Sequence, residues 1–306
     1  MIAASVAYRA GVVNARRLDP LGHRVHDGAR GVRNVALTMA AVSDATTPIA
    51  TFHHLDFSAE ALRAAKGAAR VAVCVPARDE QPTIGAIVAA VHACLVDGLG
   101  LVDELVVVDD SSVDATAQIA SDAGARVVAT HAGGAGRAVG KGHAMRTALE
   151  STTSDLVVFL DGDVENFSPH FVTGLLGPLL MRRQTMFVKG CYRRPIAGEP
   201  TGGGRVTELV ARPVLSLLFP DLTGVVQPLA GEVAVRRDAL GGIELEVGYG
   251  VELGMLIDLS RRHGVGAIAQ VDLDVRIHRN RPLHELAPQA RAVLSVALQR
   301  AGVDLL

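Results

Sequence analysis

Two aspartates separated by one glycine, Asp161-Gly162-Asp163, follow the apolar run 156–160. Residues two apart at the end of a strand point to the same side, so the two carboxylates would lie together. Oxygen ligands of this kind bind Mg2+ or Mn2+, and Gly162 leaves room for a bulky ligand. Asp and Gly are also ordinary turn residues, so a simple turn remains the alternative. The position after a buried strand favours the metal site.

Three further polar residues, Arg276, His278 and Asn280, alternate at the end of a predicted strand, 268–277. A period of two puts them on one face of an extended chain. A neutral imidazole from His278 could complete a metal shell, while Arg276 and Asn280 could bind anionic or hydroxyl groups. A solvated strand edge is the alternative interpretation.

A glycine-rich loop, 132–142, contains Lys141. The loop does not satisfy the P-loop pattern, since Gly142 and His143 follow the lysine. A lysine on such a loop could donate to a phosphate or to a nucleotide carbonyl. An ordinary surface lysine is the alternative.

A second glycine cluster, at 202–204, is followed by Arg205, Val206 and Thr207. Backbone N–H groups at a helix start, together with an arginine and a hydroxyl, form an anion site that could hold a phosphorylated or carboxylated acceptor. A flexible linker is the alternative. Glu232, Tyr249 and Glu252 add groups that could hold sugar hydroxyls in the same half of the chain.

Short apolar runs alternate with segments of helical spacing through the first half of the chain. We expect strands at 71–75, 105–108, 126–129 and 156–160, and helices at 58–66, 82–95, 115–123 and 143–151. This alternation is typical of an α/β fold with a doubly wound, mostly parallel sheet, whose ligands bind at the carboxyl ends of the strands. The later half predicts helices at 171–181, 207–218 and within 248–263, and strands at 186–190 and 268–277. We divide the chain into a partly flexible N-terminal extension, 1–68, and two halves of one unit, 69–170 and 171–306.

Composition excludes several classes of protein. The chain has 306 residues, 49% of them hydrophobic, and a net charge of -2. These values argue against disorder and against a nucleic-acid protein that binds through bulk positive charge. We find no apolar run long enough for a membrane span and no secretory signal. The 3 cysteines lack metal-type spacing, so we expect a cytoplasmic location without membrane or nucleic-acid partners.

Together the motifs resemble the glucosyl-3-phosphoglycerate synthase family of GT-A nucleotide-sugar glycosyltransferases. In the first half the resemblance rests on residues 76–80, which read Pro-Ala-Arg-Asp-Glu, on Asp109-Asp110, on Lys141 and on 161–163. In the second half it rests on longer motifs at 192–195, 202–213, 227–232, 248–252 and 269–283. The resemblance covers about residues 55–302, and the second-half motifs are its most specific part.

The resemblance implies a retaining, metal-dependent transfer of glucose from UDP-glucose to the 2-hydroxyl of 3-phosphoglycerate by a homodimer. It implies that 69–170 form the nucleotide-sugar-binding half and 171–306 the acceptor-binding half. The implied donor site is Pro76, Ala77, Arg78, Glu80, Asp110, Lys141, Asp161, Gly162, Asp163, Tyr249, Glu252 and Arg276. The implied acceptor site is Gly204, Arg205, Val206, Thr207 and Asn280. The implied metal ligands for Mg2+ or Mn2+ are Asp163 and His278, and the implied catalytic residues are Asp163, Glu252, Arg276 and Lys141.

Two departures from the family pattern lie on the nucleotide side. Arg78-Asp79 replaces the usual Leu-Asn, and Asp110-Ser111 replaces a Ser-Gly. They leave a mannosyl-3-phosphoglycerate synthase using GDP-mannose as an alternative. A sugar-1-phosphate nucleotidyltransferase would need a glycine-rich loop that 75–83 lacks, and a lipid-phosphate glycosyltransferase or a nucleotide-sensing module fits less well. For the retaining step we favour a front-face route over a covalent role for Glu252.

Overall fold

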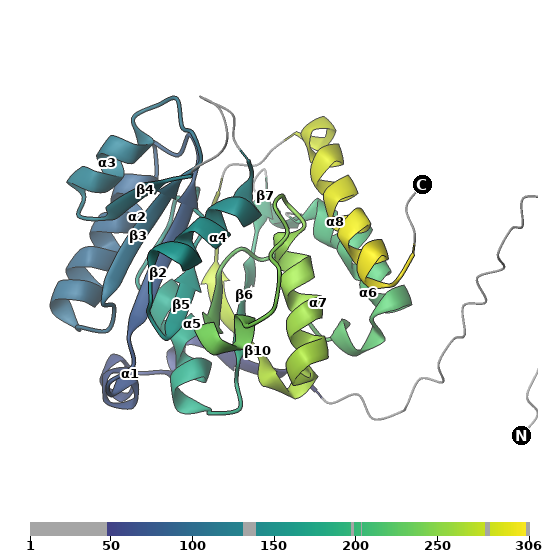
Figure 1. Cartoon of the computed structure of the whole chain (residues 1–306), viewed down its shortest axis with the longest axis horizontal. Coiled ribbons are helices and arrows are strands. Elements are labelled where there is room, and N and C mark those ends of the chain that lie inside the picture. Colours follow the sequence, from purple (N-terminus) through teal and green to yellow (C-terminus); the bar gives the residue numbers. More distant parts are fainter. Residues whose placement is uncertain (1–47, 131–138, 197–198, 203, 279–281, 304–306) are drawn as a thin grey trace, which may run out of the picture. The chain divides into compact units, whose positions relative to one another are not determined.

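One eight-stranded sheet forms the centre of the computed structural model (Figure 1), which describes residues 48–130, 139–196, 199–202, 204–278 and 282–303. The strand order is β4-β3-β2-β5-β9-β6-β10-β1. Neighbouring strands are parallel except where β9 pairs with β5 and β6. The bounds are β1 Ala50–His53, β2 Val71–Ala77, β3 Glu104–Asp109, β4 Arg126–Ala129, β5 Leu156–Phe159, β6 Phe187–Arg193, β9 Val233–Arg236 and β10 Ile268–Val275. A separate antiparallel pair consists of β7 (Pro195–Ile196) and β8 (Glu199–Gly202).

Helices cover both faces of the sheet, because its central strands are apolar on both sides. In β3, for example, Val107 and Val108 are both fully buried but belong to the cores on opposite faces. One core is closed by α1 (Ala59–Lys66), α2 (Ile84–Val91), α3 (Thr116–Asp122) and α5 (His170–Met181). The other is closed by α4 (Lys141–Ser151), α6 (Arg212–Leu218), α7 (Val251–His263) and α8 (Ala287–Arg300). The predicted α/β class with a mostly parallel, doubly wound sheet is therefore confirmed.

Several described elements were not predicted: β1, the short pair β7 and β8, β9 and α8. The expected N-terminal extension reached residue 68, and its expected helix at 58–66 is present as α1, which packs on α5. The extension also contains the unpredicted strand β1, which pairs with β10. β1 escaped notice because it is a four-residue edge strand with no fully buried residue. The antiparallel strand β9 and the helix α8 were not predicted at all.

The strand expected at 268–277 is shorter than predicted. β10 ends at Val275 after a register shift that begins at Asp272. Asp274 adopts a left-handed backbone with φ of 68°, which breaks the extended chain. Arg276 and His278 therefore lie beyond the strand, although the expected alternation survives: Arg276 is buried and Ile277 is exposed.

Among the helices formed by the described residues, none combines the length and the apolar character that crossing a membrane requires.

Candidate active site

A pocket of about 750 Å3 opens at the carboxyl ends of β2, β3 and β5. In open α/β sheets, ligands bind at this edge. The pocket is lined by every described residue of the implied donor, acceptor and metal sites: Pro76, Ala77, Arg78, Glu80, Asp110, Lys141, Asp161, Gly162, Asp163, Gly204, Arg205, Val206, Thr207, Tyr249, Glu252, Arg276 and His278. Glu232, another candidate for holding sugar hydroxyls, is fully buried and does not line the pocket. Asn280 lies outside the described residues. The fold thus brings the candidates together, while their individual roles stay predictions.

Six charged side chains from five segments form what we call the charge cluster. They are Lys141, Asp161, Asp163, Glu232, Glu252 and Arg276. One terminal nitrogen of Arg276 lies 2.8 Å from an Asp161 oxygen and 2.7 Å from an Asp163 oxygen, and its Nε lies 2.9 Å from Glu232. The Nζ of Lys141 pairs with Asp161 and lies 2.7 Å from Glu252. These pairs hold the loop after β5 against α4, α7 and the segment after β10.

The environment fixes the charges in this cluster. Burial alone would lower the pKa of Lys141, but Asp161 and Glu252 outweigh it and raise that pKa. Burial alone would raise the pKa of Asp161, but Lys141 and Arg276 bring it well below its usual range. Burial raises the pKa of Asp163, although Arg276 acts against it. At neutral pH we therefore expect a permanently cationic Lys141 and a permanently anionic Asp161 at the pocket wall.

Lys141 is the first residue of α4, where a positive side chain is unfavourable beside the positive end of the helix dipole. Its two carboxylate partners compensate for this. Glu252 lies in the first turn of α7, where a negative side chain is favourable, and it is 6% exposed. Two helix N-termini, of α4 and α7, thus meet around one lysine, an arrangement that favours an anion such as a diphosphate.

Asp110 lines the pocket, but its carboxylate is largely engaged by its own chain. One oxygen accepts from the Thr130 hydroxyl at 3.0 Å and from the Val139 amide at 3.2 Å. The other accepts from the Gly140 amide at 3.0 Å. The residue is 5% exposed. We infer that Asp110 positions the backbone immediately before Lys141, a role that the sequence did not predict.

The segment after β2 forms the wall of the pocket beside Gly162. A Cβ on Gly162 would lie 3.3 Å from Glu80 Cγ and 3.5 Å from the Pro76 carbonyl oxygen, so the two loops pack closely. The Thr83 hydroxyl donates to the Gly162 carbonyl at 2.6 Å. Asp79 has a left-handed backbone, φ 54°, and is held by the Ser112 hydroxyl, which accepts from its amide at 3.0 Å. These contacts fix the shape of the wall.

The predicted acceptor residues lie at the start of a helical segment, 205–218. Gly204 precedes it with a φ of 79°, a conformation that favours glycine. Arg205 and Thr207 lie in its first turn, and both line the pocket at this helix start.

Arg194 is a pocket residue that our list of candidates lacked. Its guanidinium stacks on the Tyr192 ring, 4.8 Å from the centroid, and donates to the Tyr192 hydroxyl at 2.8 Å. That hydroxyl in turn donates to Glu232 at 2.5 Å. The Arg194 Nε is buried without a hydrogen-bond partner among the described atoms. The motif at 192–195 was visible in the sequence, but nothing in its spacing indicated which arginine faces inward.

Three other pocket residues, Leu286, Gln289 and Val293, come from α8 or the turn before it. They were missed because α8 itself was not predicted.

Asp163 and His278, the two predicted metal ligands, both line the pocket. An isolated antiparallel bridge joins Val164 to His278, so the backbone of His278 runs beside the residue that follows Asp163. Burial, followed by Arg276 and Arg194, lowers the pKa of His278 to about 4, so its ring is neutral at pH 7 and able to ligate. The charge cluster contains four acidic residues, so this wall of the pocket is rich in the oxygen atoms that Mg2+ and Mn2+ prefer as ligands.

Comparison with known proteins gives consistent relatives. Residues 72–204 match the family described as Glycosyl transferase family 2. A glucosyl-3-phosphoglycerate synthase of Mycolicibacterium smegmatis is 46% identical over 249 residues, covering 79% of this chain and 81% of that protein. Its counterpart in Petrotoga mobilis is 42% identical over 237 residues, covering 76% and 73%.

Solved structures agree with these relatives. The crystal structure of glucosyl-3-phosphoglycerate synthase from Mycobacterium tuberculosis in complex with Mn2+, UDP-glucose and phosphoglyceric acid is similar with a TM-score of 0.77 and 45% identity. The match covers 84% of this chain and 89% of that one. A complex of the same enzyme with Mg2+ and UDP gives a TM-score of 0.76 at 44% identity, covering 84% and 88%.

Proposed function

The chain belongs to the glucosyl-3-phosphoglycerate synthase family, and from this premise we propose that it transfers glucose from UDP-glucose to the 2-hydroxyl of 3-phosphoglycerate. One observation in the structure carries the proposal. Lys141 and Arg276 converge on the Asp161–Asp163 loop in the same pocket that Arg205 and the start of the segment 205–218 line. One pocket therefore holds cationic groups for a departing diphosphate and a separate anion site for an acidic acceptor.

The proposed position of UDP-glucose follows from the residues predicted to bind its uridine, its diphosphate and its glucose. We propose that the uridine lies along Pro76, Ala77, Arg78 and Glu80, and that the diphosphate lies between Lys141 and Arg276. Tyr249 and Glu252, from the second half of the chain, complete the glucose site. The first half, 69–170, would then supply most of the donor site and the second half, 171–306, would supply the acceptor site together with part of the donor site.

Asp163 and His278 would hold Mg2+ or Mn2+, and when bound this ion neutralises part of the charge on the leaving diphosphate. Lys141 and Arg276 supply fixed positive charge at the same place, in a poorly solvated pocket where such charge acts strongly. Imidazole is better matched to a transition metal than to Mg2+, so we expect higher affinity for Mn2+.

The acceptor carries a carboxylate and a phosphate. We propose that its phosphate binds the backbone amides at the start of 205–218 together with Arg205, Thr207 and Arg194. Val206 contributes backbone only, and Asn280 was assigned here by the family resemblance. Charge-assisted hydrogen bonds to a phosphate are among the strongest that a protein makes, so this site can select an acceptor with a terminal phosphate.

Retention by a front-face route is our proposal for the stereochemistry. Glu252 is the nearest candidate for a covalent nucleophile, but its carboxylate is tied to Lys141 at 2.7 Å. A carboxylate in such a pair is a weaker nucleophile. In the front-face route the departing phosphate accepts the proton of the acceptor hydroxyl, while Glu252 holds Lys141 in place.

The test is an assay of nucleoside diphosphate release with purified protein and Mg2+ or Mn2+. UDP-glucose, ADP-glucose and GDP-mannose are compared, each with 3-phosphoglycerate, with glycerate and without acceptor. We expect release from UDP-glucose that requires 3-phosphoglycerate and is far weaker with glycerate. Because the curated relatives carry the glucosyl name, preference for GDP-mannose is not favoured, and observing it would overturn the donor assignment. Release that ignores the acceptor would overturn the transferase proposal.

Two variants test the metal assignment. Asp163→Ala and His278→Ala should each lose metal-dependent turnover while keeping the thermal stability of a folded protein. Full activity in either variant would remove that residue from the metal site.

We also propose the homodimer and the cytoplasmic location expected from the sequence. Exposed Leu209 and Leu217, 71% and 77% exposed on the segment 205–218, support an apolar contact with a second copy. Light scattering after size-exclusion chromatography should give twice the mass of one chain, and Leu217→Glu should shift it toward one chain. A monomeric wild-type protein would refute the dimer.

A further inference from the structure

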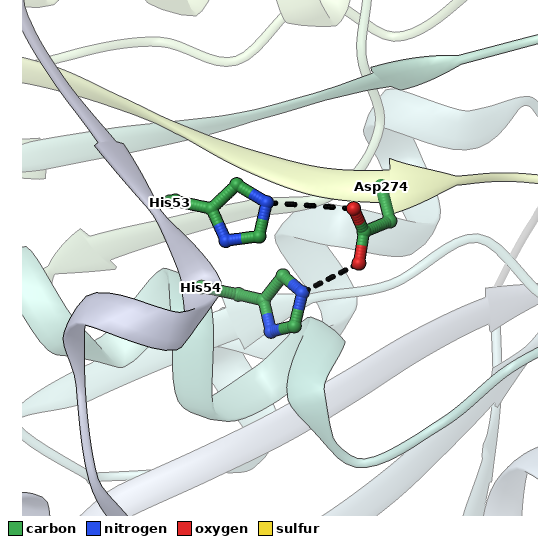
Figure 2. Close-up of side chains that lie close together, drawn as sticks. All are labelled: His53, His54 and Asp274. Atoms are coloured by element: carbon green, nitrogen blue, oxygen red, sulfur yellow. Dashed lines mark hydrogen bonds and ion pairs between the residues drawn. The ribbon is translucent and has the colours of Figure 1, made fainter.

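Two histidines and an aspartate lie together outside the pocket, where the edge strand β1 and its neighbour β10 end (Figure 2). His53 is the last residue of β1, His54 begins the following 3-10 helix, and Asp274 is near the end of β10. β1 and β10 are parallel neighbours at the edge of the sheet, with His53 in register with Asp272. The topology therefore brings the adjacent His53 and His54 together with Asp274, which is 220 positions from His54 in the sequence, and none of the three lines the pocket in the part of the chain described.

The spacing of the ligand atoms suits a small metal ion. One potential ligand atom from each residue lies within 4.8 Å of the others. The Nε2 of His53 lies 3.4 Å from one Asp274 oxygen, and the Nε2 of His54 lies 2.6 Å from the other. Zinc bonds of about 2.0–2.2 Å in a tetrahedron separate ligand atoms by about 3.3 Å. The first pair already has this spacing, and the second reaches it by opening less than about 1 Å.

The surrounding chain aims these groups at one another. The left-handed backbone of Asp274, φ 68°, is unusual for a residue other than glycine, and its amide donates to an Asp272 carboxylate oxygen at 2.9 Å. On the other side, the His170 ring stacks on His54 with centroids 4.3 Å apart, while its Nε2 donates to the Leu273 carbonyl at 3.1 Å. His54 is thus clamped, with its side chain only 10% exposed, whereas the Asp274 side chain is 47% exposed.

We propose that His53, His54 and Asp274 bind one Zn2+ ion, separate from the divalent ion at Asp163 and His278. Two imidazoles and one carboxylate are a donor set that Zn2+ prefers and that Mg2+ does not. The exposure of Asp274 leaves the fourth position to water. The ion would fasten the edge strand β1 to β10, two residues before Arg276 enters the charge cluster.

Binding requires both imidazoles to move a proton. The Nε2 of His54 lies 2.6 Å from an Asp274 oxygen, which can only accept, so this nitrogen carries a proton that must move to Nδ1 before the ring can ligate. The Nδ1 of His53 accepts from the Leu55 amide at 3.3 Å, so the proton of the neutral ring is on Nε2, which faces Asp274. Ligation through Nε2 moves that proton to Nδ1 and gives up this long, exposed hydrogen bond. Together with the opening between His54 and Asp274, these changes involve the short turn 53–56 at the end of β1 and the Asp274 side chain.

The test is calorimetric titration of the full-length protein with Zn2+, without nucleotide and after removal of metal by a chelator. The wild-type protein, Asp163→Asn and His284→Ala should each keep one tight site. His284 is a matched control, since it is a histidine with a side chain 80% exposed. Asp274→Asn and His54→Ala should each weaken that site about tenfold or more. Asparagine tolerates the left-handed backbone of position 274, so this variant removes the charge with little disturbance of the chain.

A second measurement guards against misfolding. Melting temperatures without metal should be close for wild type and Asp274→Asn, and saturating Zn2+ should raise only the wild-type, Asp163→Asn and His284→Ala values. Wild-type Zn2+ affinity in both Asp274→Asn and His54→Ala would overturn the proposal. Loss of the tight site in Asp163→Asn would also overturn it, because the ion would then belong to the pocket.

Discussion

Replacement of Gly231 by alanine should disable the enzyme, although Gly231 itself does not line the pocket. Gly231 lies against the Asp161–Lys141 ion pair, and a Cβ at this position would overlap both Asp161 Oδ1 and Lys141 Nζ. Neither atom can yield freely, since Lys141 is also held by Glu252 and Asp161 by Arg276. The added methyl group must therefore displace part of the charge cluster.

The size of the effect follows from the required displacement. Relief of the overlap needs a shift on the order of 1 Å, and a shift of this size at a reacting centre lowers turnover about 100-fold. Overpacking of a filled site costs about 1–3 kcal/mol of stability. We expect kcat to fall by about two orders of magnitude. The free energy of unfolding should fall by about 1–3 kcal/mol.

The assay is UDP release at saturating substrates, combined with urea unfolding. Gly224→Ala is the matched control, because a Cβ there would make only ordinary contacts with Ile49, at 3.6 Å and beyond. That variant should keep wild-type turnover. A Gly231→Ala protein with kcat within threefold of wild type would refute the reasoning, since the ion pair would then not be as tightly enclosed as described.

Three further predictions concern other parts of the molecule. In steady-state kinetics Arg205→Ala should raise KM for 3-phosphoglycerate about 10- to 100-fold, because a charged hydrogen bond contributes about 1.5–3 kcal/mol. KM for UDP-glucose should stay the same. A parallel rise in both constants would mean that Arg205 does not belong to the acceptor site. Asp110→Ala should leave the Thr130 hydroxyl and two loop amides without their acceptor. In urea titrations the free energy of unfolding should therefore fall by about 1–3 kcal/mol, and KM for UDP-glucose should rise. Unchanged values would show that the loop before Lys141 does not depend on Asp110. Burial lowers the pKa of Lys189 from 10.5 to about 8, so between these pH values the unfolded chain binds more protons than the folded one. The free energy of unfolding of the wild type, compared with that of Lys189→Met in paired urea titrations, should therefore rise by roughly 3 kcal/mol across this window. A difference between the two proteins that stays constant from pH 7.5 to 10.5 would contradict the burial of a charged lysine.

Periodicity was sufficient for the centre of the fold. Apolar runs such as 126–129 and 156–160 gave strands within a residue of their observed ends, because strands buried on both faces have few alternatives. The elements that escaped lie where burial is partial or where pairing is not sequential. β1 is a half-buried edge strand, and β9 is an antiparallel strand of four residues whose neighbours, β5 and β6, are distant in sequence.

The site was predictable in membership but not in geometry. The spacing of Asp161 and Asp163 and the motif around Arg205 indicated which segments carry polar groups to the pocket. No spacing could show that Arg276 bridges the two aspartates or that Asp110 turns toward its own loop, because these contacts depend on how separate segments pack. His53 and His54 are adjacent in the sequence, but their partner Asp274 is brought to them only by the pairing of β1 with β10.

The most direct measurement is 13C NMR of the reaction of UDP-glucose labelled at the anomeric carbon with 3-phosphoglycerate and Mn2+. We predict one new α-linked anomeric signal, coupled to carbon 2 of the glycerate, that appears as the UDP-glucose signal disappears. Free glucose as the sole product, or a UDP-glucose signal that does not decline, would contradict glucosyl transfer.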